Sequence, residues 1–430
     1  MSNKKSNTST IAIVGMGYVG IPLCKSFLES GNSVIGIDIN ETRIRELNNN
    51  HISLNHLADI NFEEHIDNNM ASFSSDFKVC AEADSIIICV PTPVDKDANP
   101  DLGPIKNAIS SIIPYLKEGH LISLESTTYP GTTKEEIVLP LEENGYKVGK
   151  DIYVVYSPER EDPGNKDFNC KNTPKLVGGH SNECLKKGIQ LYSKVVDQTV
   201  PVSSCEIAEF AKLYENTYRA VNIGLANEMK VVADSFNLDI YEIIRAAATK
   251  PFGFSAFYPG PGVGGHCIPV DPAYLNWKAE QNGIKSNLIE HALKINKDIS
   301  KFVVNKAISE LKDNGKGIKD SNILVLGVSY KNNIDDIRES PSIDIIKMLL
   351  EHNAKVSFDD DYVSYESVGI NNIDKINNIT SDISKLKKFD AVLLLTSHDY
   401  YNIENVSKHC HIVVDTRGIF NVNDNNIIRG

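Results

Sequence analysis

The sequence lacks several features that would place it in a broad class of protein. No apolar run approaches the ~18–20 residues that a membrane helix needs, and residues 1–9 are polar, without the apolar core of a signal peptide. Basic residues are in deficit, because 44 Lys and Arg face 57 Asp and Glu, and the formal net charge is −13. We therefore expect a cytoplasmic protein that binds neither nucleic acid nor membranes, since both attract basic surfaces.

Cysteine patterns of metal sites and disulfide frameworks are also missing. Eight cysteines are scattered along the chain without a C-x-x-C pair or the His/Cys spacing of a zinc site. We expect reduced thiols, most of them small core residues, and no bound metal.

What is present is a long globular chain in which strand and helix patterns alternate. A length of 430 residues predicts two or three domains of ~100–200 residues each. Apolar runs of strand length enclose helical stretches such as residues 21–30, which indicates a parallel sheet covered on both faces. The predicted strands are residues 11–14, 33–39, 85–90, 121–126 and 152–156.

The middle of the chain is helical, and the alternation then resumes. From residue 205 onward, apolar or small residues recur about one helical turn apart, which predicts a long central helix. Further strands are predicted at residues 323–326, 355–358, 391–395 and 412–414. The predicted fold class is α/β, with two Rossmann-like doubly wound domains joined by that helix. We place the domains at residues 1–204, 205–312 and 313–430.

A glycine-rich turn lies between the first predicted strand and helix. Its sequence is Gly15-Met16-Gly17-Tyr18-Val19-Gly20, and Asp38 ends the next strand. Glycines there let backbone N–H groups approach a pyrophosphate. Asp38 lies 18 residues after Gly20, and a carboxylate at about that spacing suits the ribose of NAD. Arg43 could instead accommodate the phosphate of NADP. The plainer alternative is an ordinary turn, with Asp38 capping the strand end.

A second glycine-rich segment, residues 260–272, surrounds Cys267 and Asp271. A lone cysteine is usually a core residue, but dense glycines allow a cofactor or substrate to come close, which favours a reactive thiol in this loop. His266 is the neighbouring residue, and adjacent side chains rarely face each other, so we do not favour it as a base. Lys212 and Asn216 lie one turn apart on the central helix and share a face. A solvated face is the alternative for that pair.

In their order and spacing these segments resemble the UDP-glucose/GDP-mannose dehydrogenase superfamily, from Ile11 to about Arg417. The motifs that carry the resemblance are GMGYVG (15–20), PTP (91–93), EST (125–127), SPER (157–160), AKLYEN (211–216), GGHCIPVD (264–271) and GVSYK…RESP (327–341).

The resemblance implies a four-electron oxidation that uses two NAD molecules in succession. Cys267 would trap an aldehyde as a thiohemiacetal and then carry a thioester, which water releases as a uronic acid. Lys212 and Asn216 would stabilise oxyanions, Asp271 would assist proton transfer, and Thr127 would help to hold the catalytic water.

The family pattern also implies binding residues. Implied cofactor contacts are Gly15, Gly17, Tyr18, Val19, Gly20, Asp38, Arg43, Thr92, Thr127 and Arg338. Implied substrate contacts are Glu159, Arg160, Lys212, Asn216, Phe257, Tyr258, Gly264 and Lys331, of which Lys331 could also reach the cofactor phosphates. For Arg338 with Glu339, the alternative is a surface ion pair at a helix start.

The chain departs from the family pattern at two places. Pro163 stands where many relatives have a second glutamate, so Glu159 or Glu161 must serve if hydrolysis needs a base. Pro251, beside Lys250, stands where some relatives have a substrate-binding arginine.

The sugar is indicated by resemblance alone. Two segments resemble the UDP-N-acetylhexosamine branch of the family: residues 248–262, and SPEREDPG at 157–164. The PFGF and FYPGPG motifs within residues 248–262 most resemble UDP-N-acetylglucosamine 6-dehydrogenases of surface-polysaccharide pathways. UDP-N-acetylmannosamine and UDP-glucose are the alternative substrates. A catalytically silent nucleotide-binding protein and a two-electron dehydrogenase are the other classes. The family also implies a homodimer, or a higher homo-oligomer, built on the central helix.

Overall fold

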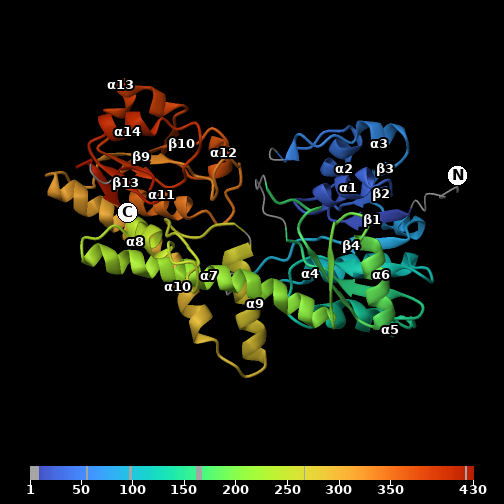
Figure 1. Ribbon diagram of the computed structural model, residues 1–430. Coiled ribbons are helices and arrows are strands. Elements are labelled where there is room, and N and C mark those ends of the chain that lie inside the picture. The colour runs from blue at the N-terminus through green and yellow to red at the C-terminus, as the bar shows by residue number, and fades with distance from the viewer. Residues whose placement is uncertain (1–8, 55–56, 96–98, 161–166, 266, 422–423) are drawn as a thin grey trace. The chain divides into compact units, whose positions relative to one another are not determined.

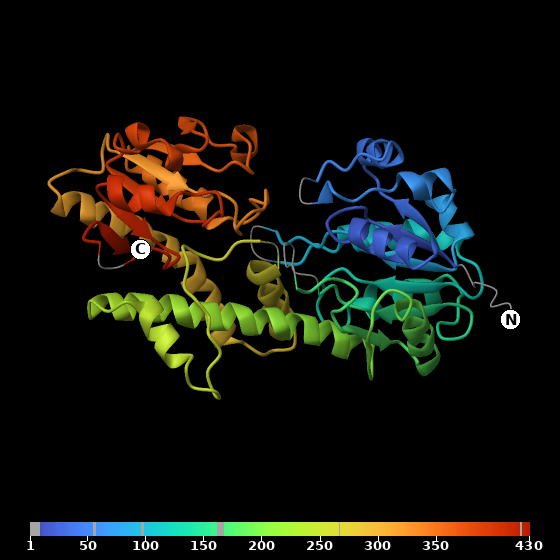
Figure 2. The same cartoon turned by 45° about the horizontal axis from the view of Figure 1, so that its top comes forward.

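The computed structural model describes residues 9–54, 57–95, 99–160, 167–265, 267–421 and 424–430. The chain forms two compact units, one of residues 1–215 with 277–284 and one of residues 216–276 with 285–430. Helix α7 (Cys205–Ser235) joins them and is drawn as one unbroken helix in both views (Figures 1 and 2). The long central helix predicted from the sequence is therefore confirmed.

The first unit contains an eight-stranded sheet in the order β3-β2-β1-β4-β5-β6-β7-β8. Neighbouring strands are parallel except for β6 and β7, so the prediction of a parallel sheet is wrong at that pair. The described residues between β6 and β7 form no helix, and a parallel return needs such a crossover. The strands are β1 Thr10–Val14, β2 Ser33–Ile37, β3 Ala71–Ser74, β4 Ser85–Ile88, β5 Leu121–Leu124, β6 Tyr153–Tyr156, β7 Lys175–Gly179 and β8 Thr199–Val202.

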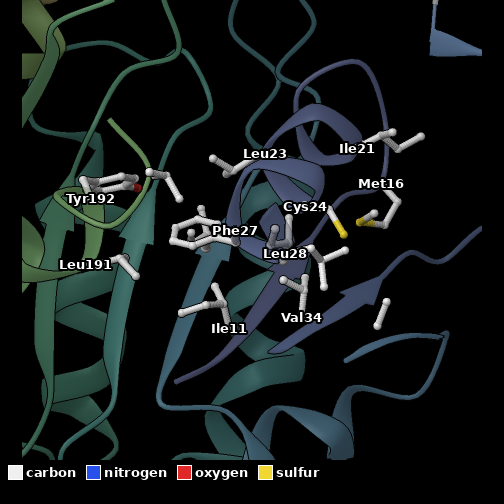
Figure 3. Close-up of a cluster of buried hydrophobic side chains, with 14 of the residues drawn as sticks. Ile11, Met16, Ile21, Leu23, Cys24, Phe27, Leu28, Val34, Leu191 and Tyr192 are labelled. Carbon is white, nitrogen blue, oxygen red and sulfur yellow. The ribbon is translucent and has the colours of Figure 1, made fainter. Parts of the chain in front are cut away.

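Apolar side chains on both faces hold this sheet. Ile11 and Ile13 pack on one face against α1, while Ala12 and Val14 are buried on the other. Figure 3 shows Phe27 of α1 within that first cluster. The helices are α1 Gly20–Glu29, α2 Glu41–Asn48, α3 Glu63–Asp67, α4 Gly103–Ile112, α5 Leu139–Glu143 and α6 Asn182–Tyr192, with the 3-10 helices η2 Phe77–Glu82 and η3 Ile113–Tyr115 and the π-helix η4 Lys134–Val138.

The second unit contains a six-stranded sheet in the order β11-β10-β9-β12-β13-β14, with every neighbouring pair parallel. Ile323 and Val325 of β9 pack with α10 and α11, whereas Leu324 and Leu326 pack with α13 and α14. Both faces are thus covered, as predicted. The strands are β9 Asn322–Leu326, β10 Lys355–Asp359, β11 Ile373–Lys375, β12 Ala391–Leu394, β13 Val413–Asp415 and β14 Ile427–Arg429.

The remaining helices belong to the middle of the chain and to the second unit. They are α8 Ile240–Ala247, α9 Cys267–Gln281, α10 Asn287–Asp313, α11 Pro341–Glu351, α12 Tyr365–Val368, α13 Ile383–Leu386 and α14 Ile403–His409, with η5 Ile379–Ser381. The α/β fold class with two sheet-containing domains is confirmed. The division at residues 204 and 312 stays a prediction.

Candidate active site

The turn between β1 and α1 needs glycine at two positions and leaves a third open. Gly15 has φ +99°, and a Cβ added there would lie 2.7 Å from the carbonyl oxygen of Cys89. At Gly20, the first residue of α1, it would lie 1.9 Å from the carbonyl oxygen of Gly15. At Gly17 it would meet nothing within 4 Å. The backbone around Gly17 is therefore accessible to a ligand at the start of a helix.

Asp38 closes this turn from the end of β2. Its Oδ2 accepts a hydrogen bond from the backbone N–H of Met16 at 2.9 Å, and its Oδ1 accepts one from Asn40 at 2.9 Å. Arg43 lies 3.5 Å from Asp38 Oδ2, so its guanidinium is turned to the carboxylate. An open glycine backbone, a helix N-terminus and a strand-end carboxylate together fit a dinucleotide.

The strand order puts other predicted residues at the same edge of the first sheet. β1 lies between β2 and β4, so the chain changes direction across the sheet there, and ligands of such folds bind at this switch point. Thr92 follows β4 and is buried, and Thr127 follows β5 and is half-buried. Tyr18 and Val19 are half-buried in the glycine turn.

A buried ion pair beside Thr127 was not predicted. Glu125 and Lys175 are 2.9 Å apart, and Tyr192 donates a hydrogen bond to Glu125 at 2.6 Å. Burial raises the pKa of Glu125. Burial acts to lower the pKa of Lys175, but the charges of Glu125 and Glu159 raise it overall. The sequence does show the carboxylate of Glu125 directly after an apolar strand, which could have marked it as a candidate site residue. Its partner Lys175 begins β7, a strand that the sequence pattern did not predict.

Lys212 and Glu159 come together in the first unit. Lys212 Nζ donates to the backbone carbonyl of Glu159 at 2.6 Å, which leaves the carboxylate of Glu159 out of that bond. Arg160 pairs with Glu215 and donates to the carbonyl oxygen of Pro174 at 2.7 Å. Lys212 is only 8% exposed and Asn216 5%, so the solvated-face alternative for this pair is wrong.

In the second unit Asn216 donates a hydrogen bond to Asp271 Oδ2. Asp271 is fully buried on α9, one helical turn after Cys267, which is exposed. The expectation of a loop around the thiol is wrong at this point, because Cys267 begins α9. Pro269 is tolerated in a first helical turn. A helix N-terminus stabilises negative charge, which suits a reactive sulfur.

The glycine loop before α9 packs closely on the segment that follows β9. A Cβ added at Gly264 would lie 2.5 Å from Cβ of Tyr330, and Gly265 donates a backbone hydrogen bond to Arg338 at 2.9 Å. Arg338 forms its ion pair with Asp336, at 2.6 Å. Gly264 and Arg338 are thus brought into one neighbourhood.

The other predicted substrate residues lie elsewhere in the second unit. Phe257 packs edge-on against Tyr218 with ring centroids 5.7 Å apart, and Tyr258 stacks on Tyr241 at 6.5 Å. Lys331 is half-buried in the turn after β9. His266, Glu161 and Pro163 lie outside the described residues.

Cys267 differs from the other cysteines. All eight lie within the described residues, and Cys267 alone is exposed. Burial raises the thiol pKa of Cys24, Cys80, Cys89, Cys205 and Cys410. Thiols of that kind are inert core residues, Cys184 is buried as well, and Cys170 is half-buried, so Cys267 is the most accessible thiol and the candidate nucleophile.

In the part of the chain that the structure describes, no helix is long and apolar enough to cross a membrane. Within the same residues, no group of three or more His, Cys, Asp or Glu side chains is placed to hold a metal ion.

The chain is similar to known proteins over nearly its full length. It is 38% identical to Protein CapL of Staphylococcus aureus over 97% of each chain, and 33% identical to the UDP-N-acetyl-D-glucosamine 6-dehydrogenase of Salmonella typhi over 95% of each. The solved structure of the UDP-D-ManNAc dehydrogenase of Pyrococcus horikoshii superposes with a TM-score of 0.85, at 30% identity and 96% coverage of each chain.

Three family models match in succession. The NAD binding domain of the UDP-glucose/GDP-mannose dehydrogenase family matches residues 9–196, the central domain residues 206–298, and the UDP binding domain residues 324–422. The glycine turn of the first unit is thus part of an NAD-binding domain. With these matches and the superposed structure, the chain belongs to the UDP-glucose/GDP-mannose dehydrogenase family and is an NAD-dependent UDP-sugar dehydrogenase.

Proposed function

We propose that this chain oxidises the C6 alcohol of UDP-N-acetyl-D-glucosamine to the carboxylate, giving UDP-N-acetylglucosaminuronate for surface-polysaccharide synthesis. The observation that carries the proposal is the near-full-length similarity to UDP-N-acetylhexosamine dehydrogenases, and residues 248–262 favour the glucosamine form by resemblance. The C2 epimer, UDP-N-acetyl-D-mannosamine, is the second candidate, because relatives of that name are as similar.

When bound, NAD accepts one hydride in each of the two oxidations of C6. The Cys267 sulfur adds to the C6 aldehyde and forms a thiohemiacetal. Loss of the C6 hydride from that adduct leaves a thioester on Cys267. Water then attacks the thioester carbon, the C–S bond breaks, and the thiol and the sugar carboxylate are released. A thiol is needed because an aldehyde by itself lacks the alkoxide that expels hydride.

Asp271 and Asn216 are proposed to act on the oxygen that is bonded to C6. Asp271 would take the proton of that oxygen, and Asn216 would stabilise its negative charge. Asp271 stands one turn from the thiol on the same helix, and the amide of Asn216 orients its carboxylate. A buried carboxylate held in this way can accept a proton at a fixed position. The ammonium of Lys212 and the amide of Asn216 are proposed to stabilise the oxyanions, the first by charge and the second by a directed hydrogen bond.

The hydrolysis step is proposed to use Glu159 and Thr127. The Glu159 carbonyl holds Lys212, so its backbone and the catalytic ammonium are fixed together. Thr127 follows β5 at the switch-point edge, where its hydroxyl could hold the attacking water.

The binding residues are proposed from the family motifs in the sequence. We assign the NAD contacts to the turn of Gly15, Gly17, Tyr18, Val19 and Gly20 with Asp38, Arg43, Thr92, Thr127 and Arg338. We assign the UDP-sugar contacts to Glu159, Arg160, Lys212, Asn216, Phe257, Tyr258, Gly264 and Lys331.

A homodimer is proposed through the apolar face of α7 and α8. This face lines a groove of about 810 Å³ with the 251–257 segment, and Leu225, Val232, Phe236 and Phe252 are exposed there. Exposed apolar patches of this kind mark protein contacts, and a second copy of the chain would bury the same face on both partners.

The deciding experiment is the number of NADH formed per sugar consumed. The purified protein is offered UDP-N-acetylglucosamine, UDP-N-acetylmannosamine and UDP-glucose separately. We expect two NADH per molecule of the first sugar. Two NADH with the mannosamine epimer only would transfer the proposal to that substrate. One NADH per sugar would support a two-electron dehydrogenase, and none with any sugar would favour a catalytically silent relative.

A further inference from the structure

The turn after β9 carries Lys331, and a buried carboxylate holds its first residues. Gly327 has φ +84° and donates its N–H to the carbonyl of Asp359 at 3.0 Å. Asp360 Oδ2 accepts hydrogen bonds from the N–H groups of Val328 at 2.8 Å and Ser329 at 3.0 Å. Burial acts to raise the pKa of Asp360, but hydrogen bonds from His398 and these amides lower it overall. The carboxylate is thus a fixed acceptor beneath the turn.

His398 links this carboxylate to the far side of the turn. Its Nδ1 accepts a hydrogen bond from the backbone N–H of Asn333 at 3.0 Å. Because that N–H can only donate, Nδ1 presents its lone pair and the ring hydrogen is on Nε2. Nε2 lies 3.0 Å from Asp360 Oδ2 and donates to it, and Ser329 Oγ lies 3.3 Å from the same nitrogen. One tautomer of His398 therefore satisfies Asn333 on one side of the ring and Asp360 on the other.

The ring of His398 is held in place and cannot itself reach a ligand. Its side chain is fully buried. Tyr362, Tyr400 and Tyr401 pack around it with ring centroids 5.0, 5.6 and 5.5 Å away. Any effect of His398 on substrate must therefore pass through the turn.

Lys331 lies in the sequence between Ser329 and Asn333, and hydrogen bonds hold the backbone on both sides. On one side, Ser329 Oγ donates to the carbonyl oxygen of Lys331 at 2.9 Å, and Thr396 Oγ1 donates to the carbonyl of Ser329 at 2.6 Å. On the other side, Asn333 is held by His398 and accepts from the N–H of Asp399 at 3.1 Å. The backbone is thus ordered before and after Lys331.

We propose that His398 is a positioning residue that sets the affinity for the UDP part of the substrate by ordering the backbone of Lys331 through Asn333. The inference rests on the proposed contact of Lys331 with the nucleotide-sugar. A lysine on an ordered backbone loses less conformational freedom on binding than one on a loose turn. Without the acceptor at Nδ1, the turn must be ordered at the moment of binding.

Two substitutions separate the contact at Nδ1 from the contacts at Nε2. His398→Asn can place its amide oxygen where Nδ1 stands and so keep an acceptor for Asn333. His398→Gln can place its amide nitrogen where Nε2 stands, which keeps the donor to Asp360 but removes that acceptor. Both variants remove the imidazole ring, so a merely structural role predicts similar losses from the two.

The measurement is UDP affinity by titration calorimetry, with the KM for NAD and the melting temperature recorded alongside. We expect His398→Gln to weaken UDP binding about tenfold and His398→Asn to stay within about threefold of the parent, because one hydrogen bond to the backbone separates them. The KM for NAD should be unchanged in both. Lys331→Ala serves as the reference and should weaken UDP binding at least as much as His398→Gln.

Equal losses of UDP affinity in the two His398 variants, or no loss in either, would overturn the proposal. Unchanged UDP binding by Lys331→Ala would overturn it as well, because Lys331 would then lie outside the UDP site. UDP carries no sugar, so failure of the proposed sugar assignment would appear in the NADH stoichiometry and would leave this pattern of affinities intact.

Discussion

The first strand of each sheet ends in a turn of the same construction. Gly15 follows β1 and donates to the carbonyl of Ile37 at 2.8 Å, and Gly327 follows β9 and donates to the carbonyl of Asp359 at 3.0 Å. Both glycines have positive φ, +99° and +84°. In each sheet an aspartate after the second strand accepts hydrogen bonds from the turn. The shared strand order of the two sheets, from the edge through the sixth strand, places these groups alike.

The two aspartates differ in what surrounds them. Asp38 accepts one N–H from its turn and one from Asn40, and its charged neighbour is the partly exposed Arg43. Asp360 accepts two N–H groups from its turn and one from Tyr362, and the buried His398 donates to it. The first carboxylate is partly accessible, and we propose that it contacts the ribose of NAD, whereas the second carboxylate is fully buried and supports the turn. Side-chain partners, and not topology, separate the two roles.

The largest effect is expected from a change in the second unit alone. Cys267→Ala should lower uronate formation by ~10³-fold or more, because the covalent route is lost, while NAD affinity stays unchanged. Product is followed by chromatography and NAD affinity by calorimetry. Cys170→Ala is the matched control and should remain active. Uronate formation at the parent rate by Cys267→Ala would rule out the covalent mechanism.

A large loss of stability is expected from the buried ion pair of the first unit. Glu125→Gln should lower the free energy of unfolding by about 3–5 kcal/mol, because Lys175 is left buried and charged without its partner. Differential scanning calorimetry of the whole chain measures this. The double variant Glu125→Leu/Lys175→Met should cost less than the two single changes together, and simple additivity would contradict a coupled pair.

The second unit also contains a buried lysine, Lys230, whose pKa is shifted in the opposite direction from that of Lys175. Lys230 is fully buried, its Nζ has no hydrogen-bond partner among the described residues, and it lies 5.8 Å from the ring centroid of Phe302. Burial lowers its pKa from 10.5 to about 7. Between these values the unfolded chain binds more protons than the folded one, so the contribution of this group to stability rises with pH.

Lys230→Met should therefore stabilise the protein by roughly 2 kcal/mol or more at neutral pH. The gain should be greatest below about pH 7 and should shrink as the pH rises toward 10, as the lysine loses its charge in both states. Thermal unfolding of the parent and the variant across this range measures the difference. A gain that is independent of pH would show that Lys230 is not the group that titrates.

The smallest effect is expected at the rim of the first sheet. Asp38→Ala should weaken NAD binding about tenfold, because a ribose hydroxyl would lose a charged acceptor, while UDP affinity stays unchanged. Calorimetry with each nucleotide separates the two results. Unchanged NAD affinity would remove Asp38 from the ribose site, and equal loss for both nucleotides would indicate general damage to the fold.

Sequence alone was sufficient for the features that are local. Alternating patterns predicted the α/β class and the long helix from Cys205, and the glycine spacing at Gly15–Gly20 predicted the turn after β1. Such signals lie within a few residues, where strand period, helix period and glycine conformation are fixed by covalent geometry. Spacing also put Lys212 and Asn216 on one face of the long helix, but the sequence did not show that a helix begins at Cys267.

Only the tertiary structure decided which distant side chains meet. Lys175 reaches Glu125 across 50 residues of sequence, Asn216 reaches Asp271 across 55, and His398 reaches Asn333 across 65. The antiparallel pairing of β7 with β6 was likewise not predicted by any local pattern. Each pairing satisfies a polar group that folding buries, and burial is a property of the whole chain. For this reason the residue types were readable in advance, and their partners were not.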